Sequence, residues 1–190
     1  YVTAPVCSPS RAGILTGKNQ FRWDKPASWG PGLPDDVKTL PEYLKEVGYK
    51  TARIGKNDLG RNFHKNDVRE YPLSHGYDEF LGFSAHAHDF PYGTSALLGP
   101  LMHNMGSKSY DEGYLTDILT DESISYIKQK HDKPFFLTLA YSSVHHLIHA
   151  VPNKYLDKYG AKEIPNYDPD SLLVYGKHEP GTYSAYYDKY

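Results

Sequence analysis

Two stretches of the chain carry apolar residues at the spacing of an amphipathic helix. In the first, residues 39–47, these residues are Leu40, Tyr43, Leu44 and Val47. In the second, residues 114–130, they are Leu115, Ile118, Leu119, Tyr126 and Ile127. Because residues three and four apart share one face of an α-helix, both stretches are predicted to be helical. Gly48 is expected to end the first helix.

Two further stretches are predicted to be strands. Residues 49–54 form a short one, which ends just before Gly55 and Lys56. Residues 135–141 are apolar apart from Thr138, a composition typical of a parallel sheet that is covered on both faces. In open α/β sheets, ligands bind at the carboxyl ends of the strands. The residues that follow these two strands are therefore candidates for a site.

Three segments show no apolar period and are rich in glycine and proline: residues 18–36, 84–109 and 152–180. Segments this long without regular structure are often functional loops. We expect residues 84–109 to be a long excursion that builds a substrate cleft.

The single cysteine of the chain lies in the segment Cys7-Ser8-Pro9-Ser10-Arg11-Ala12-Gly13-Ile14-Leu15-Thr16-Gly17. Pro9, with Ser10 as the cap, predicts a short helix over residues 11–15 that Gly17 ends. Cys7 would then lie just ahead of a helix N-terminus, where free N–H groups and the helix dipole favour an anion such as sulfate or phosphate. Arg11 would add a fixed positive charge. The competing interpretation is a small buried thiol.

This segment resembles the signature of the type I sulfatases, C-x-P-S-R followed by L-T-G. Residues 48–56 are similar to the family's G-Y-x-T and strand ending in G-K, and residues 76–82 to its G-F-D-E-F-x-G element. The resemblance implies an α/β fold of the alkaline phosphatase and sulfatase type, with a mostly parallel central sheet flanked by helices. It covers nearly all of this chain but only the middle part of a family member. Residues 1–190 are therefore expected to be a partial catalytic domain that lacks an N-terminal metal-binding strand and a C-terminal part.

The resemblance also implies roles for individual residues. Cys7 would be converted to formylglycine by the formylglycine-generating enzyme and would act, when hydrated, as the nucleophile. Arg11 would support it, and Lys56 would bind sulfate. His145, which follows the second strand, matches the family histidine that contacts sulfate and protonates the leaving oxygen. His88 falls where family members often carry a substrate contact, although an ordinary loop residue is an equal alternative.

Position 58 departs from the family pattern. The family motif G-K-W-H-L-G reads here Gly55-Lys56-Asn57-Asp58-Leu59-Gly60, so an aspartate replaces a histidine that helps to break down the sulfated intermediate. A carboxylate repels sulfate unless a metal or a lysine offsets its charge, and it lacks the pKa of imidazole. Two interpretations of Asp58 stay open, a contact with a substrate hydroxyl and a structural cap.

The family also implies a divalent cation, usually Ca²⁺. Of its ligands, only Cys7, as formylglycine, would come from this chain, and the others would lie outside it. His145 and His149 have a spacing that suits zinc on a helix, but Pro152 argues against a helix there and no third ligand follows the pattern. With its cation site incomplete, the isolated stretch is expected to have no sulfatase activity.

Composition narrows the choice of partners. The formal net charge of −2 over 190 residues gives no reason to expect nucleic acid, and no apolar run approaches the length of a membrane span. The 18 tyrosines suit stacking on sugars, although tyrosines between core and surface explain most such counts. The family leads us to expect an extracytoplasmic location, either periplasmic, secreted or lysosomal.

The function predicted from the resemblance is hydrolysis of a sulfate ester, on a carbohydrate or an aryl substrate. One alternative is a phosphonate or phosphate ester hydrolase of the same superfamily. Another is a non-catalytic, glycan-binding or vestigial protein, which the aspartate at position 58 favours.

Overall fold

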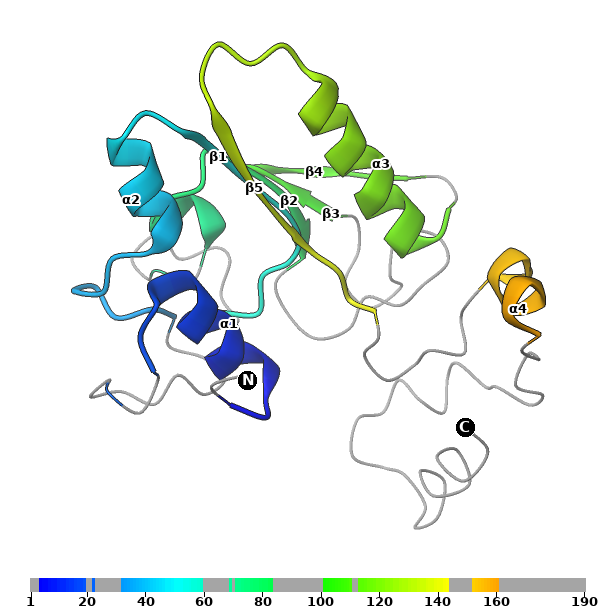
Figure 1. Ribbon diagram of the computed structural model, residues 1–190, viewed down its shortest axis with the longest axis horizontal. Helices are drawn as coiled ribbons and strands as arrows, with labels where there is room; N and C mark the ends of the chain where they lie inside the picture. The colour runs from blue at the N-terminus through cyan, green and yellow to red at the C-terminus, as the bar shows by residue number, and fades with distance from the viewer. Residues whose placement is uncertain are drawn as a thin grey trace. The chain divides into compact units, whose positions relative to one another are not determined.

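The computed structural model describes residues 4–19, 22, 32–59, 69, 71–83, 101–110, 113–143 and 152–160. The chain divides into two compact units, Tyr1–Ala150 and Val151–Tyr190, which are described separately. In the second unit the described element is the helix α4 (Asn153–Tyr159). The other elements belong to the first unit (Figure 1).

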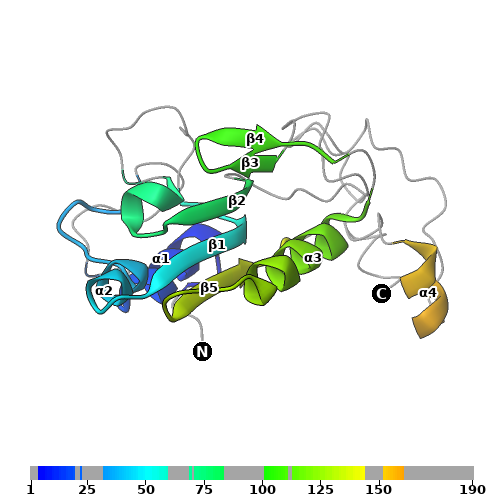
Figure 2. The same cartoon turned by 90° about the horizontal axis from the view of Figure 1, so that it is seen from above.

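A five-stranded sheet with the order β4-β3-β2-β1-β5 forms the first unit (Figure 2). The strands are β1 (Lys50–Lys56), β2 (Glu79–Phe83), β3 (Leu101–His103), β4 (Gly106–Lys108) and β5 (Phe135–Ala140). β1 is parallel to both β2 and β5, while β3 and β4 are an antiparallel hairpin beside β2. The predicted α/β class is confirmed. The β3–β4 hairpin was not among the predicted elements, because the sequence predicts no regular structure in residues 84–109.

The helices of this unit are α1 (Cys7–Thr16), α2 (Leu40–Glu46) and α3 (Leu115–Lys128), together with the 3₁₀ helix η2 (Pro72–His75). The helices predicted over residues 39–47 and 114–130 are thus confirmed, within a few residues at their ends. In Figure 1, α3 lies on one side of β5 and β1, and α1 and α2 lie on the other.

Each face of the sheet has its own apolar cluster, because successive side chains of a strand point to opposite faces. On the α3 face the fully buried members are Ala52, Ile54, Leu81, Phe83, Leu101, Leu115, Ile118, Leu119 and Tyr126. On the α1 face they are Ala12, Leu15, Leu33, Leu59 and Tyr77. Phe136 of β5 packs on the second cluster, while Phe135 and Leu137 pack on the first. This alternation fixes the register of β5 beside β1.

The three parallel strands approach one another closely near their carboxyl ends. Gly55 pairs with Gly82 on one side and with Ala140 on the other. A Cβ atom on Gly55 would lie 2.1 Å from the Ala140 carbonyl oxygen, and one on Gly82 would lie 1.9 Å from the Gly55 oxygen. Gly55 also has a φ of +106°, in the left-handed region. Glycine is therefore required immediately before Lys56.

The start of α1 differs from the prediction. The helix begins at Cys7 rather than after it, with Val6 as the N-cap and no side chain as cap. Ser10 does not cap the helix, because its hydroxyl donates a hydrogen bond of 2.6 Å to the Ala4 carbonyl. The predicted end is confirmed, since Gly17 has a φ of +65° and its N–H bonds back to the last turn.

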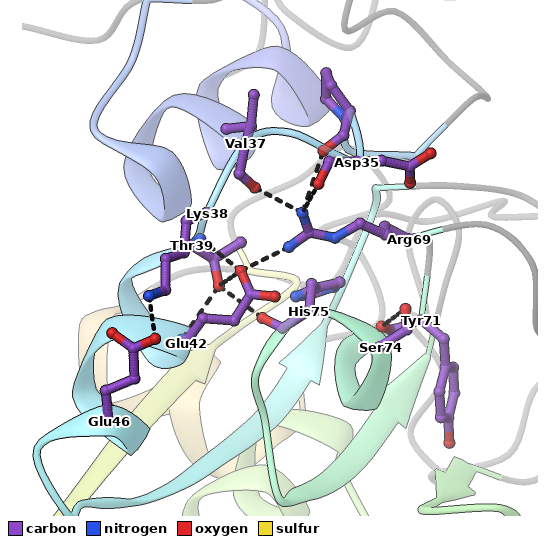
Figure 3. Close-up of polar contacts among 11 residues, drawn as sticks. Asp35, Val37, Lys38, Thr39, Glu42, Glu46, Arg69, Tyr71, Ser74 and His75 are labelled. Atoms are coloured by element: carbon purple, nitrogen blue, oxygen red, sulfur yellow. Dashed lines mark hydrogen bonds and ion pairs between the residues drawn. The ribbon is translucent and has the colours of Figure 1, made fainter.

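Polar groups at its N-terminus hold α2 in place. Thr39 and Glu42 form a capping box. Figure 3 shows Arg69 between this box and the preceding loop: it donates to the carbonyls of Pro34, Asp35 and Val37 and to the Glu42 carboxylate. The apolar stripe of the helix is largely uncovered, with Leu40 43%, Tyr43 54% and Val47 70% exposed. The apolar period of the sequence predicted this helix, but within the described residues its apolar face is not packed against the core.

Candidate functional site

Residues from the start of α1 and the end of β1 meet on one face of the sheet. Cys7 is the first residue of α1, Arg11 follows one turn later, and Lys56 is the last residue of β1. Asp58 lies two residues beyond the strand. Four of the six residues that the sequence proposes for the site therefore lie together in the structure, although 45 positions separate Arg11 from Lys56.

Asp58 links the cations of this cluster. Its Oδ2 atom lies 3.3 Å from Lys56 Nζ and 4.0 Å from Arg11 Nε. The side chains of Lys56 and Asp58 are only 2% and 6% exposed, whereas that of Arg11 is 23% exposed. Since a buried charge is strongly unfavourable without a partner, Lys56 and Asp58 each require the other as a counterion. The cluster reaches the surface on the side of Arg11 and of the partly exposed Cys7.

The backbone at position 58 is unusual. Asp58 has a φ of +58°, in the left-handed region that few residues other than glycine, asparagine and aspartate adopt. With this backbone conformation, the carboxylate of Asp58 lies beside Lys56 Nζ. Asp58 thus follows the end of β1 and pairs with the buried lysine, and both interpretations of its role, a contact with a substrate hydroxyl and a structural cap, stay open.

Arg53 is a member of the cluster that sequence reasoning missed. It lies in β1, is 2% exposed, and donates from Nη2 to the carbonyl oxygens of Lys56 and Asn57. Arg11 donates from Nη1 to the same Lys56 carbonyl, at 3.1 Å. Two guanidinium groups therefore fix the backbone at the end of β1. The available signal was a charged residue between two apolar ones, Ala52 and Ile54, in the interior of the predicted strand, because a buried charge is rare unless it is paired.

The surroundings of Cys7 keep its thiol protonated. Burial raises the pKa of Cys7, and Asp58 raises it further as a hydrogen-bonding partner and as a negative charge, whereas Lys56 lowers it. The net direction is upward from the usual value. Because the thiolate is the reactive form of cysteine, unmodified Cys7 is a poor nucleophile at neutral pH. The backbone N–H of Ser8, in the first turn of α1, also lowers the pKa of the thiol, but burial and Asp58 outweigh this effect.

Arg11 is close to a second guanidinium. Burial lowers the pKa of Arg11, and the positive charge of Arg53 lowers it further, while Asp58 and Cys7 act in the opposite direction. Arginine nevertheless stays charged in proteins. The cluster therefore concentrates positive charge beside Cys7, an arrangement that favours a bound anion.

Two of the predicted site residues lie outside the described residues. These are His145, the expected proton donor, and His88, the expected substrate contact. The geometry of the cluster therefore concerns Cys7, Arg11, Lys56 and Asp58 only.

The described residues do not form a metal site. No three histidine, cysteine, aspartate or glutamate side chains converge in the described part of the chain. Ca²⁺ takes six to eight oxygen ligands, roughly, and the cluster offers Asp58 as its only carboxylate in an ion pair with Lys56 and Arg11. These residues alone do not fit the cation implied by the resemblance.

None of the helices within the described ranges has the length and apolar character needed to cross a bilayer.

Sequence comparison assigns the chain to a family. The sulfatase family model matches residues 1–190, and the chain belongs to that family. An arylsulfatase of Hemicentrotus pulcherrimus is 32% identical over 171 residues, which cover 76% of this chain and 30% of the relative. The human N-acetylgalactosamine-6-sulfatase is 33% identical over 177 residues, which cover 79% of this chain and 32% of the relative. The chain thus spans about a third of the length of these relatives.

Solved structures show the same fold. A structure of Ps i-CgsB in complex with k-i-k-neocarrahexaose has a TM-score of 0.71 and 25% identity, over 90% of this chain and 40% of that protein. BT4656 in complex with D-glucosamine-2-N,6-O-disulfate has a TM-score of 0.58 and 24% identity, over 91% and 31% respectively. The fold is that of the sulfatases, which the resemblance at the level of sequence predicts.

Proposed function

We propose that the whole protein hydrolyses sulfate esters, with residue 7 at the reaction centre. The observation that carries this proposal is the convergence of Cys7, Arg11 and Lys56. They come from two segments that match separate sulfatase motifs, and they meet at the carboxyl end of the central strand. Membership of the sulfatase family supports it.

In this proposal the cations bind the anionic group of the substrate. Lys56 Nζ and the Arg11 guanidinium contact the sulfuryl oxygens and stabilise the charge that moves onto them during transfer. Arg53 and Arg11 hold the Lys56 carbonyl, which keeps the lysine in position. His145 gives a proton to the departing oxygen. Low exposure of Lys56 strengthens its attraction for the anion, because water screens the charge poorly.

Residue 7 must be modified for this chemistry. As formylglycine, it would supply a hydrated aldehyde with an oxygen nucleophile, and the electrostatic interaction of Cys7 with Lys56 supports this assignment. A cysteine whose thiol stays protonated would not replace it. The formylglycine-generating enzyme is the expected partner for the modification, and a divalent cation is proposed with ligands from elsewhere in the protein.

We propose a sulfated carbohydrate as the substrate. N-acetylgalactosamine-6-sulfatases are among the relatives, and Ps i-CgsB has been solved with a neocarrahexaose. Arylsulfatases also match, so aryl sulfate esters are suitable test substrates. The proposed location, again by family, is extracytoplasmic.

The decisive experiment is turnover by the full-length protein, produced together with the formylglycine-generating enzyme. We expect hydrolysis of an aryl sulfate and of sulfated oligosaccharides, an aldehyde at residue 7 by peptide mass, and almost complete loss of activity in Lys56→Ala. Faster hydrolysis of an aryl phosphonate than of any sulfate would favour the phosphonate or phosphate hydrolase alternative. A converted residue 7 without any turnover would favour a vestigial protein, for which Asp58 in place of the family histidine is the motivating observation.

Residues 1–190 alone are proposed to be inactive. The described residues do not assemble a set of metal ligands, and the relatives are about three times as long. Assay of this stretch beside the full-length protein checks the proposal, and turnover by the stretch alone would contradict it.

A further inference from the structure

The cations of the candidate site outnumber its anions. Arg11, Arg53 and Lys56 carry three positive charges, and within the described residues the carboxylate that forms ion pairs with Arg11 and Lys56 is that of Asp58. Arg53 and Lys56 are 2% and 1% exposed, so water screens their charges poorly. A buried ammonium without a counterion is strongly unfavourable. The protein without a ligand therefore needs an anion at this place.

Asp58 supplies that anion. One oxygen of its carboxylate, Oδ2, is within ion-pair distance of both Lys56 Nζ, at 3.3 Å, and Arg11 Nε, at 4.0 Å. The same side chain interacts with the thiol of Cys7. Asp58 thus touches all three groups that the proposed function assigns to the substrate's sulfuryl group.

We infer that Asp58 is an internal anion that occupies the subsite of the sulfuryl oxygens, and that a tetrahedral oxyanion binds by displacing this carboxylate from Lys56 and Arg11. The inference rests on the proposed function and deepens it, since it names Asp58 as the residue that sets the affinity of the site for oxyanions. The carboxylate and a sulfate cannot both hold the two cations closely, because like charges at such short range repel.

Displacement is compatible with the local structure. Asp58 lies outside the sheet ladder, two residues after β1, and its side chain has a single rotatable bond between the backbone and the carboxylate-bearing carbon. Rotation about this bond would take the carboxylate away from the cations while the strand stays in place, on the side of Arg11 where the cluster reaches the surface. Arg53 and Arg11 keep the Lys56 backbone fixed meanwhile, because both donate to its carbonyl oxygen, a contact that does not involve the Asp58 side chain. A site with a built-in competitor binds its anion less tightly, which aids release of the sulfate product.

The test measures binding of inorganic sulfate to the full-length protein with Cys7 unconverted, so that no turnover intervenes. Two variants remove the carboxylate: Asp58→Asn keeps the size of the side chain and tolerates a positive φ, and Asp58→Gly accepts that φ without strain. We expect both to lower the sulfate dissociation constant by about tenfold in calorimetric titration, the effect of removing one competing ion pair. The matched control is Asp36→Asn, an exposed carboxylate, which should leave the constant unchanged.

Thermal unfolding gives a second readout that a purely structural role would not produce. Without sulfate, both variants should melt at a lower temperature than the wild type, because Lys56 and Arg11 have lost their counterion. With saturating sulfate, the increase in melting temperature should be larger in the variants than in the wild type. Equal or weaker sulfate binding in both variants would overturn the inference, whether or not the protein hydrolyses sulfate esters. Conversely, tighter sulfate binding in the variants, together with absence of turnover by the wild-type protein whose residue 7 is converted to formylglycine, would overturn the proposed function and leave the inference standing.

Discussion

The guanidinium of Arg11 donates a hydrogen bond of 3.1 Å to the backbone carbonyl of Lys56. This bond connects the helix that begins with Cys7 to the end of the central strand. Lys56 itself is fixed to β2 through its pairing with Phe83. Arg11 therefore controls the distance between residue 7 and the lysine ammonium. Its positive charge alone is not sufficient for this, because the contact depends on the geometry of the guanidinium group.

Substitution of Arg11 tests this control. Arg11→Met removes a charged donor and should lower the free energy of unfolding by about 1.5–3 kcal/mol. Arg11→Lys keeps the charge but not the planar donor geometry, so it should restore only part of the stability and of sulfate binding. Chemical denaturation and sulfate titration of the full-length protein provide both measurements. Arg22→Lys, at an exposed position, is the control; full rescue by Arg11→Lys would show that charge alone suffices.

Alanine substitutions of Gly55 and Gly48 test the close packing of the parallel strands. Both have positive φ values, but a Cβ on Gly55 would lie 2.1 Å from the Ala140 oxygen, whereas one on Gly48 would meet nothing within 4 Å. Gly48→Ala should cost about 1 kcal/mol, from backbone strain alone. Gly55→Ala should cost more than about 3 kcal/mol, because the parallel strands must also move apart. Unfolding curves of the two full-length variants compare them directly, and similar losses would contradict the close packing described here.

The pKa of Cys7 should depend on Asp58. Burial and Asp58 raise the pKa of the thiol, so alkylation of unconverted Cys7 should be slow at neutral pH and accelerate only in alkaline solution. In Asp58→Asn the rise of the rate should begin at lower pH, because the negative charge is gone while Lys56 remains. Iodoacetamide labelling over a pH series, read from the mass of the Cys7 peptide, measures this. An unchanged profile in the variant, with Asp36→Asn as reference, would exclude the interaction.

His75 should make the protein sensitive to acid. Its ring is fully buried, neither nitrogen has a hydrogen-bond partner within the described residues, and burial lowers its pKa from 6.5 to about 3, helped by the charges of Arg53 and Arg69. The unfolded chain takes up the proton below pH 6.5 and the folded chain does not. Stability is therefore complete above pH 6.5 and falls by up to about 1.4 kcal/mol per pH unit between pH 6.5 and 3.

Replacement of this histidine tests the assignment. In His75→Leu the part of the acid slope that comes from residue 75 should disappear, since leucine fills similar volume and binds no proton. The measurement is the free energy of unfolding of the full-length protein at several pH values. His103→Gln serves as control because His103 is exposed. An equal slope in wild type and His75→Leu would mean that other groups cause the acid sensitivity.

The part of the site that could be predicted from sequence is the part encoded in local motifs. Cys7 and Arg11 are one helical turn apart, and Lys56 follows a strand that its own composition identifies. The rule that sites form at the carboxyl ends of parallel strands pointed to Lys56, and the family resemblance implied that Cys7 and Arg11 meet it there. The family resemblance added the expected chemistry.

What escaped prediction depends on contacts between distant segments. The sequence alone does not distinguish a buried Arg53 from an exposed one in a short strand. The fold shows that it is buried, with two backbone carbonyls as hydrogen-bond partners. The hairpin of β3 and β4 is too short to leave a periodic signal, and it gains its place by pairing with β2. The apolar stripe of α2 has the correct helical period, but period alone does not say what covers it.

Strand β5 has a practical consequence for work with this stretch of the protein. Its six residues, Phe-Phe-Leu-Thr-Leu-Ala, are all partly exposed, and among the described strands it pairs with β1 alone. An uncharged, largely apolar edge strand of this kind is a template for cross-β assembly. Soluble preparations of residues 1–190 would then require either the remainder of the polypeptide or a gatekeeper charge introduced on that edge.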